Sequence, residues 1–313
     1  MTAIRETREK IDPHAVRADI DLSAVRAALG QKIVEHDEAT AAPLRGMVVT
    51  FDRDERAPEV GEPIAPGWHL AYFPDASRLA ELGADGLPLA RGVLPAMPLP
   101  RRMYAGARLT FHAPILVGDT LTRESEFSDV QLREGSTGVL ILATLTRRFF
   151  TPRGLALTDE QHTVFREAVP PGAPSGVPRH EAPPSDTQWQ RTIVPDPVSL
   201  FRYSALTFNG YRIHYDQRFA TEVQGHPGLV VHAPLVATLL ADLLRRNLPE
   251  ASVSSFSFRA ITALYDTGAF FVSGRPDGDG SVKLWARDPG GALAVEATAR
   301  LEPPLAFPLT FHA

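Results

Sequence analysis

The segment 169–186 limits what this chain can fold into more than any other part of the sequence. It contains six prolines and two glycines in 18 residues. Each proline lacks a backbone N–H donor and restricts the residue before it, so the segment can form neither a helix nor an inner strand. We therefore expect a linker here, between an N-terminal part, residues 1–168, and a C-terminal part, residues 187–313. With 313 residues, 44% of them hydrophobic, the chain is long enough for two domains.

The C-terminal part is predicted to contain one apolar helix followed by antiparallel strands. Pro234 lies near the first helical position, and Arg245 and Arg246 occupy the last turn, where cations favour the helix dipole. The apolar side chains of this helix share one stripe: Leu235, Val236, Leu239, Leu240, Leu243 and Leu244. After the helix, an apolar residue recurs at every second position in three segments, 253–261, 281–287 and 291–300. A period of two predicts strands with one covered face.

The N-terminal part repeats this order less regularly. A helix-prone segment, residues 68–83, precedes three segments that are predicted to form strands, residues 106–131, 136–150 and 154–168. The similar order of elements in the two parts suggests an internal duplication. We therefore expect an α+β architecture that is built twice.

The composition and the missing motifs exclude several classes of protein. The absence of cysteine rules out disulfides, thiolate nucleophiles and cysteine-ligated metal sites. The sequence contains no GxSxG, GxGxxG, GK[ST] or HExxH motif, which argues against a serine hydrolase, a nucleotide-binding enzyme and a zinc protease. A formal net charge of −5 argues against a nucleic-acid-binding protein. We expect neither a metal nor a nucleic-acid partner.

The amino terminus is charged from Arg5 onward and lacks the apolar core of a signal peptide. No later stretch is apolar for long enough to cross a bilayer. We therefore expect a soluble, cytoplasmic protein with no membrane partner. The 29 arginines against three lysines suit bidentate recognition of phosphate or carboxylate, although a coding bias explains the same ratio.

Residues 201–240 concentrate the side chains that can carry chemistry. His214, Asp216, His226 and His232 all lie before or at the start of the apolar helix. A helix amino terminus offers unpaired N–H groups and the positive end of the helix dipole, so it can hold a developing oxyanion. Because Pro234 has no N–H, the backbone of Ala233 is the nearest candidate donor.

This segment resembles the MaoC-like hotdog-fold hydratases and dehydratases. Their signature is an aspartate followed five residues later by histidine in a D-x-N-P-I-H type run, and then an A-H-G type turn that starts the central helix. The corresponding run here is residues 209–214, and the turn is residues 231–234. His214 matches the catalytic histidine of the family, and Asn209 takes the place of the catalytic aspartate.

The resemblance is stronger to the double-hotdog subfamily of mesaconyl-C4-CoA (3-methylfumaryl-CoA) hydratases, itaconyl-CoA hydratases and mitochondrial 3-hydroxyacyl-thioester dehydratases. It rests on four segments, residues 94–121, 154–167, 201–216 and 225–240. The resemblance implies a tandem hotdog, each half an antiparallel sheet wrapped around a central helix. Residues 1–168 would form a degenerate hotdog that shapes the acyl pocket, 169–186 the linker, and 187–313 the catalytic hotdog.

The same resemblance implies a hydro-lyase that adds water to the double bond of an α,β-unsaturated acyl-CoA. The expected substrate is a short branched dicarboxylic acyl-CoA, such as mesaconyl-C4-CoA or itaconyl-CoA, which gives citramalyl-CoA. One alternative is a (3R)-3-hydroxyacyl-thioester dehydratase of a fatty-acid or polyketide pathway. Another, from a different class, is an acyl-CoA thioesterase or a thioester-binding protein without catalysis, which the missing aspartate favours.

Two catalytic arrangements are open because an amide cannot act as a base. In the first, His214 is the sole acid–base group and Asn209 positions the water. In the second, Asp216 supplies the missing carboxylate, because residues two apart in an extended segment point to the same side. Asp216 also precedes a possible short helix and would then serve as its cap.

The remaining site residues are expected to bind substrate rather than react with it. The oxyanion and acyl part are assigned to Ala233, His232, Gly228 and Tyr211. Cationic partners for the coenzyme A phosphates are assigned to Arg102, Arg202 and Arg212. No cofactor is expected beyond the coenzyme A of the substrate itself. Because hotdog sheets commonly pair, we also expect a homodimer.

Overall fold

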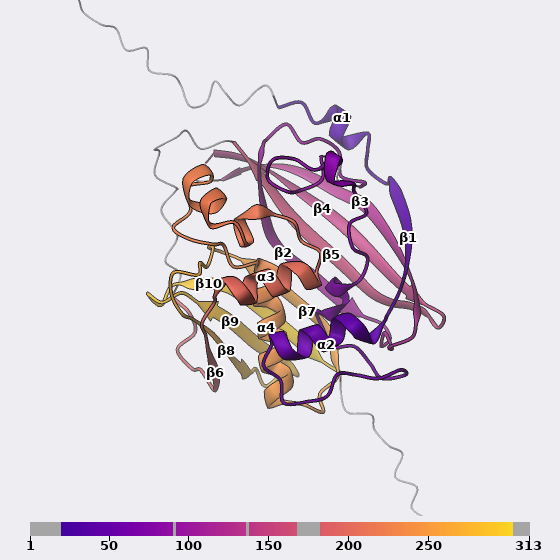
Figure 1. The fold of residues 1–313 in the computed structure, drawn as a ribbon, viewed down its shortest axis with the longest axis vertical. Coiled ribbons are helices and arrows are strands. Elements are labelled where there is room, and N and C mark those ends of the chain that lie inside the picture. Colours follow the sequence, from indigo (N-terminus) through magenta and orange to yellow (C-terminus); the bar gives the residue numbers. More distant parts are fainter. Residues whose placement is uncertain (1–19, 90–91, 136–137, 168–181, 303–313) are drawn as a thin grey trace, which may run out of the picture.

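The computed structural model describes residues 20–89, 92–135, 138–167 and 182–302. The N-terminal half contributes five strands: β1 (Lys32–Glu38), β2 (Arg101–Phe111), β3 (Thr120–Gly135), β4 (Gly138–Thr151) and β5 (Gly154–Arg166). The C-terminal half contributes five more: β6 (Trp189–Ile193), β7 (Val253–Ala260), β8 (Phe270–Pro276), β9 (Ser281–Arg287) and β10 (Leu293–Leu301). All ten form one antiparallel sheet in the order β1-β3-β4-β5-β2-β7-β10-β9-β8-β6 (Figure 1).

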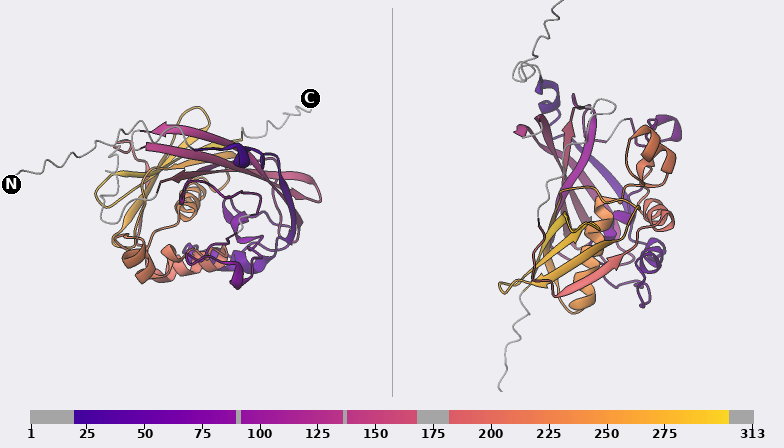
Figure 2. Two further views of the ribbon diagram at one scale, coloured as in Figure 1. Left: turned by 90° about the horizontal axis from the view of Figure 1, so that it is seen from above. Right: turned by 90° about the vertical axis from the view of Figure 1, so that its left-hand side faces the viewer.

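The described helices are few and are divided between the two halves. The described α-helices are α1 (Ser23–Arg26), α2 (Ala41–Thr50), α3 (Pro197–Leu206) and α4 (Ala233–Asn247). Shorter helical turns are η2 (Trp68–Ala71), η3 (Leu79–Glu81), η4 (Arg212–His214) and η5 (Phe219–Val223). Seen from above, the sheet curves around α4, while α2 and α3 lie across its open side (Figure 2).

The two halves meet where β2 pairs with β7. The register places Ala107 opposite Phe258 and Leu109 opposite Phe256. Gly106 lies at an irregularity in β2, and a Cβ added there would be 2.1 Å from the Phe258 carbonyl oxygen. Only glycine permits this approach, because its φ of +147° and the close backbone both exclude a side chain. The halves therefore share one sheet rather than packing as separate sheets.

The expected helix at residues 232–247 is confirmed as α4, and its leucine stripe is buried in a core that draws on both halves. The strands expected in the C-terminal part are also confirmed, as β7, β9 and β10. The helix expected at residues 68–83 is wrong. That segment forms only η2 and η3, because Phe73 has a positive φ of 59° and the following Pro74 cannot donate to a helix.

Most of the expected linker, residues 168–181, lies outside the described residues, and residues 182–186 adopt no helix or strand. The domain boundaries at 168 and 187 therefore stay a prediction. Within the described ranges, no helix is both long enough and apolar enough to cross a membrane.

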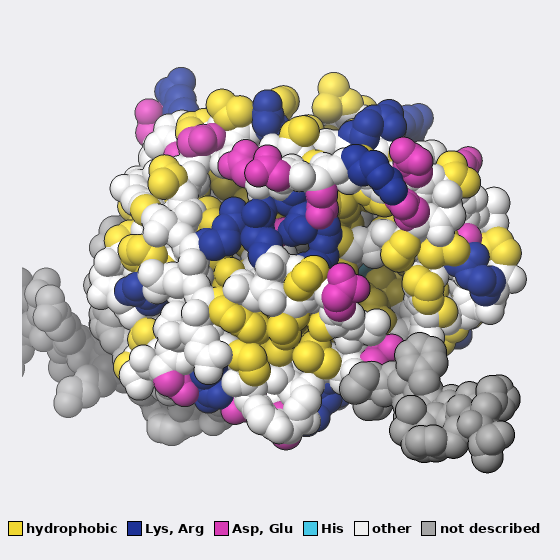
Figure 3. Space-filling view, turned by 90° about the horizontal axis from the view of Figure 1, so that it is seen from below, with side chains coloured by type: hydrophobic (Ala, Val, Ile, Leu, Met, Phe, Trp, Pro, Cys, Tyr) yellow, Lys and Arg dark blue, Asp and Glu magenta, His cyan; other side chains and the backbone are white. Residues whose placement is uncertain are grey.

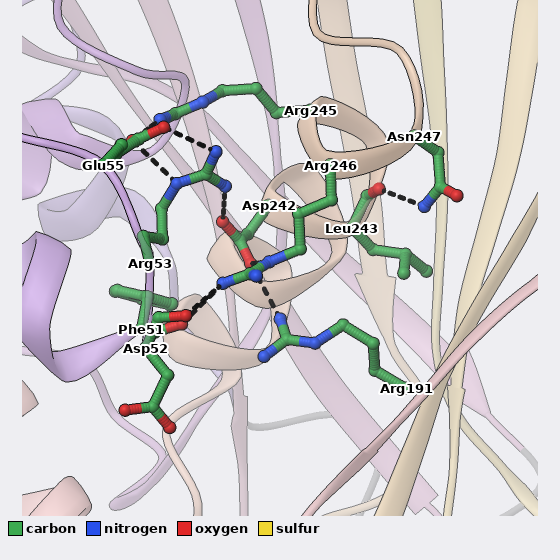
Figure 4. A network of polar contacts seen from close by, with 10 residues as sticks. All are labelled: Phe51, Asp52, Arg53, Glu55, Arg191, Asp242, Leu243, Arg245, Arg246 and Asn247. Carbon is green, nitrogen blue, oxygen red and sulfur yellow. Dashed lines mark hydrogen bonds and ion pairs between the residues drawn. The ribbon is translucent and has the colours of Figure 1, made fainter.

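A polar network at the carboxyl end of α4 also ties the halves together (Figure 4). The Asp242 carboxylate of α4 has a side chain only 3% exposed and pairs with three arginines: Arg53, Arg191 and Arg246. Arg53 follows α2 in the N-terminal half, whereas Arg191 lies on β6. Lys and Arg side chains gather in a hollow near the middle of the lower face of the molecule (Figure 3).

Candidate active site

His214 is buried, and one of its two ring nitrogens is already hydrogen-bonded to the backbone. It ends η4 and is 7% exposed. Its Nδ1 lies 2.7 Å from the carbonyl oxygen of Val230. A carbonyl can only accept, so Nδ1 carries the hydrogen and Nε2 carries the lone pair of the neutral ring. Burial lowers the pKa of His214 to about 4, so the ring is neutral near pH 7.

The ring of His232 packs directly against the ring of His214. The two rings stack with centroids 3.7 Å apart and planes 18° from parallel. His232 is 1% exposed, and its Nε2 lies 2.8 Å from the Ser204 hydroxyl on α3. Burial, and then the neighbouring His214, holds the pKa of His232 well below its ordinary range. His232 therefore fixes the position of the His214 ring, and its assigned contact with substrate stays a prediction.

Asn209 is oriented by the turn that it starts. Its side-chain oxygen accepts a hydrogen bond from the Tyr211 N–H at 3.1 Å. The preceding Phe208 has a left-handed φ of 51°, which reverses the chain after α3. Because the oxygen closes this turn, the NH₂ group is the part of the amide left to hold a water or a substrate oxygen. Tyr211 lies edge-on to His214, with ring centroids 5.6 Å apart.

The carboxylate of Asp216 is occupied by partners other than the catalytic histidine expected beside it. Residues 212–214 form a helical turn, so the extended conformation that would bring His214 and Asp216 to one side is wrong. Asp216 accepts hydrogen bonds from the Phe219 N–H at 3.0 Å and from the Arg212 guanidinium at 2.7 Å. These contacts hold the pKa of its carboxyl below its usual range. Asp216 therefore acts as a helix cap, the second of the two roles expected of it.

The three arginines expected to bind the coenzyme A phosphates have different surroundings. Arg212 is already bound to Asp216, to the Ala84 carbonyl at 2.8 Å and to the face of the Phe219 ring. Arg202 is exposed on α3, and Arg102 is half-buried at the start of β2. Phosphate binding by these three arginines stays a prediction.

The first turn of α4 has backbone N–H donors without an acceptor among the described residues. The N-cap residue His232 makes no side-chain capping bond, and Pro234 occupies the first turn. Among the described residues, the Ala233 N–H has no hydrogen-bond acceptor. Gly228 packs under the adjoining loop, where a Cβ would lie 2.3 Å from Asp266 Oδ1. Gly228 is thus needed for packing, and its assigned contact with substrate stays a prediction.

A loop of the N-terminal half contacts the segment that carries His214, and the sequence did not predict this contact. The Asp85 carbonyl accepts from the Arg212 N–H at 2.9 Å. Gly86 has a φ of +84°, and a Cβ there would lie 2.1 Å from the Gly210 carbonyl oxygen. The glycines at 83 and 86 signal a turn, but nothing in the sequence indicates that it contacts residues 210–212.

A narrow pocket lies beside this site, between α4 and the seam of the two halves. Its lining comes from the η2 segment, β2, β5, α4 and β7 and is mostly apolar: Pro66, Gly67, His69, Leu70, Tyr104, Ala107, Leu109, Asp159, Pro234, Ala237, Thr238, Ala241, Phe256 and Phe258. The pocket begins next to Ala233 and reaches Ala241, roughly 10 Å further along the helix at 1.5 Å a residue. Its mostly apolar lining suits the apolar part of a ligand whose polar end lies at the start of α4.

Comparison with known proteins connects this geometry to an activity. The family model described as "Hydroxyacyl-thioester dehydratase type 2" matches residues 67–266. The mesaconyl-C(4)-CoA hydratase of Chloroflexus aurantiacus is 40% identical over 276 residues, which cover 88% of this chain and 97% of that protein. The mitochondrial hydroxyacyl-thioester dehydratase type 2 of Schizosaccharomyces pombe is 24% identical over 64% of this chain and 74% of its own.

Solved structures show the fold. A MaoC-like dehydratase from Phytophthora capsici superposes with a TM-score of 0.66 at 14% identity, covering 89% of this chain and 97% of its own. A conserved hypothetical protein from Mycobacterium tuberculosis, described as a double hotdog, superposes with a TM-score of 0.52 at 15% identity, covering 88% and 96%. The expected double-hotdog fold is confirmed.

Proposed function

Since the chain belongs to the hydroxyacyl-thioester dehydratase type 2 family and is a hydro-lyase acting on acyl thioesters, we propose that it hydrates a short, branched dicarboxylic acyl-CoA. Mesaconyl-C4-CoA or itaconyl-CoA would give citramalyl-CoA. The 40% identity to a mesaconyl-C(4)-CoA hydratase, over nearly the full length of that protein, supports this substrate class. The observation that carries the chemistry is the neutral His214, whose lone pair is left on Nε2 by the bond to Val230.

In the proposed reaction, His214 acts as both base and acid. Nε2 takes a proton from the water as its oxygen bonds to the β-carbon, and the double-bond electrons move toward the thioester carbonyl. The Ala233 N–H stabilises the enolate oxygen that forms. The imidazolium then returns a proton to the α-carbon, so one water is added and the ring is neutral again. A low pKa makes that imidazolium a strong acid for the second step.

Asn209 would hold the attacking water through its NH₂ group. This position requires no carboxylate, because His214 carries the proton in both steps. Of the two arrangements left open by the sequence, the structure favours this one, since the Asp216 carboxylate is occupied by Arg212 and the Phe219 N–H.

A second candidate function is dehydration of a (3R)-3-hydroxyacyl thioester. The similarity to the hydroxyacyl-thioester dehydratase of S. pombe favours it. It uses the same residues in the reverse direction: neutral His214 removes the α-proton and then protonates the leaving hydroxyl.

The test is a panel of enoyl-CoA and 3-hydroxyacyl-CoA thioesters, with enoyl absorbance followed in both directions. We expect loss of absorbance with mesaconyl-C4-CoA, and a decrease in kcat of about 10²–10⁴-fold in His214→Ala, the usual contribution of a general acid–base group. His162→Ala, on β5 and hydrogen-bonded only to Thr144 among the described residues, is the matched control. Faster turnover of long-chain 3-hydroxyacyl thioesters would support the dehydratase, and release of free thiol would support a thioesterase.

A further inference from the structure

The pocket beside α4 has a polar end that the proposed reaction does not use. His69 and Asp159 line it and are 4% and 3% exposed. Within the described residues, His69 Nε2 and Asp159 Oδ1 have no hydrogen-bond partner. Buried polar atoms are nearly always paired with protein, water or ligand. Two such atoms on the wall of an otherwise apolar pocket indicate a polar group on the ligand that enters it.

The two atoms can be bridged by one small group. His69 Nε2 lies 3.9 Å from Asp159 Oδ2, so Nε2 and the carboxylate face each other across a space too wide for a direct hydrogen bond. A neutral imidazole can donate from Nε2, whereas an ionised carboxylate can only accept. With the proton of His69 on Nε2, the matching group accepts one hydrogen bond from His69 and donates another to Asp159.

Two ion pairs lie around this end of the pocket. Arg147 of β4 lies 3.6 Å from Asp159 and donates to Gln161 at 2.5 Å. Arg123 of β3 pairs with Glu35 of β1 at 2.6 Å. Tyr104 of β2 also lines the pocket and is neutral, because burial, and then the Asp159 charge, raises its pKa well above the ordinary value. Arg147 and Arg102 act on it in the opposite direction. A ligand group with a net charge would place one uncompensated charge in this buried cluster.

We propose that this end of the pocket binds a carboxyl group of the acyl chain in its protonated form. The carboxyl O–H donates to Asp159 Oδ1, and its carbonyl oxygen accepts from the Nε2–H of His69. Both buried atoms gain a partner, and the net charge of the cluster does not change. This inference rests on the proposed function and adds to it the residues that distinguish a dicarboxylic acyl group from a plain enoyl group.

The position along α4 suits a short acyl chain. Gly67, two residues before His69, packs against Thr238, where a Cβ would lie 3.0 Å from the hydroxyl. Thr238 lies five residues beyond Ala233, roughly 7 Å along the helix at 1.5 Å a residue. A thioester carbonyl at Ala233 and a second carboxyl near His69 therefore match the two ends of a short dicarboxylic chain.

If the carboxyl binds in this way, KM depends on pH because the substrate's own carboxyl group must be protonated. A free carboxyl with a pKa near 4 is ionised at neutral pH and must take up a proton to bind in this way. We expect KM for mesaconyl-C4-CoA to rise by about tenfold per pH unit between pH 6 and 8, the factor that one proton imposes. KM for the analogue with a methyl group in place of the distal carboxyl should stay constant over the same range.

Two variants test the two atoms separately. In Asp159→Asn, the amide can donate to an ionised carboxylate and the Arg147 charge is no longer cancelled, so the rise of KM with pH should disappear. In His69→Phe, kcat/KM for the dicarboxylic substrate relative to the methyl analogue should fall by about tenfold or more, the usual effect of one lost hydrogen bond to such a group. His162→Phe, the same substitution at another position of the N-terminal sheet, should leave this ratio unchanged.

The outcomes separate this inference from the proposed function. Hydration of both substrates with parallel pH profiles, or an Asp159→Asn profile as steep as that of the wild type, would overturn the carboxyl site while leaving the hydratase intact. Preference for an analogue with a distal hydroxyl at every pH would also overturn it. If the wild type hydrates neither substrate, the proposed function itself fails. Circular dichroism of each variant establishes that it folds.

Discussion

Among single residues, the proposed reaction depends on a histidine that stays neutral. Burial lowers the pKa of His214 to about 4, so kcat/KM for a substrate without a second carboxyl should be flat from pH 5 to 8 and fall only near pH 4. A pH–rate profile with such a methyl-substituted analogue measures this. A decrease centred near pH 6.5 would show instead that the ring titrates as an exposed histidine.

The same pKa predicts how stability depends on pH. The unfolded chain protonates His214 near pH 6.5, whereas the folded chain resists protonation until about pH 4. The unfolded state therefore binds more protons in this interval, and the free energy of unfolding falls as pH decreases, by up to about 3 kcal/mol from this group. Urea unfolding at several pH values should show a smaller decrease in His214→Gln. Equal slopes in the two proteins would contradict the burial of a neutral ring.

Ser204 provides a test of the positioning role of His232. Removing its hydroxyl in Ser204→Ala leaves His232 Nε2 buried without the partner at 2.8 Å. We expect kcat to fall by about tenfold with little change in KM, because a misplaced base affects the reaction more than binding. Steady-state kinetics provides both values, and Ser128→Ala, which removes a hydroxyl from strand β3, is the control. A change confined to KM would assign Ser204 to substrate binding instead.

At the scale of elements, the catalytic segment depends on a loop from the other half of the chain. Gly86→Ala introduces a side chain at a φ of +84° and within 2.1 Å of the Gly210 carbonyl oxygen. We expect activity to fall by about tenfold or more, since small displacements of a catalytic segment cost this much. Gly61→Ala has a similar φ of +87° but open space around it, so it shows the effect of backbone strain alone. Equal activity of the two variants would show that the loop at Gly86 does not hold the catalytic segment in place.

The elements differ in how far the sequence could predict them. The leucine stripe of α4 and the alternation in β7, β9 and β10 are local patterns, and all four were predicted. His214 was assigned through a resemblance to a family motif that is likewise contiguous, and its catalytic role stays a prediction. The contact of Gly86 with Gly210 and the proximity of His69 to Asp159 bring together residues far apart in the chain, and no periodicity encodes them. The segment 68–83 failed because its composition favours a helix that Pro74 interrupts.

At the scale of the whole molecule, Asp242 joins α4 to both halves of the structure. Asp242→Asn would leave Arg53, Arg191 and Arg246 close together with one compensating charge fewer. We expect a loss of about 3–5 kcal/mol in the free energy of unfolding, the usual effect of removing one partner of a buried ion pair. Glu222→Gln, which breaks an exposed pair with Arg218, should change stability by less than about 1 kcal/mol. Similar urea midpoints for the two variants would show that the network contributes little.

In the proposed reaction, the protein adds water to an enoyl thioester and His214 is the acid–base group. This reaction is tested by incubating the protein with mesaconyl-C4-CoA in ¹⁸O-labelled water and in D₂O, and analysing the product by mass spectrometry. We predict one ¹⁸O at the β-carbon and one deuterium at the α-carbon with the wild type, and neither with His214→Ala. Unlabelled substrate with the wild type, or the same labelling at the same rate with His214→Ala, would contradict the account.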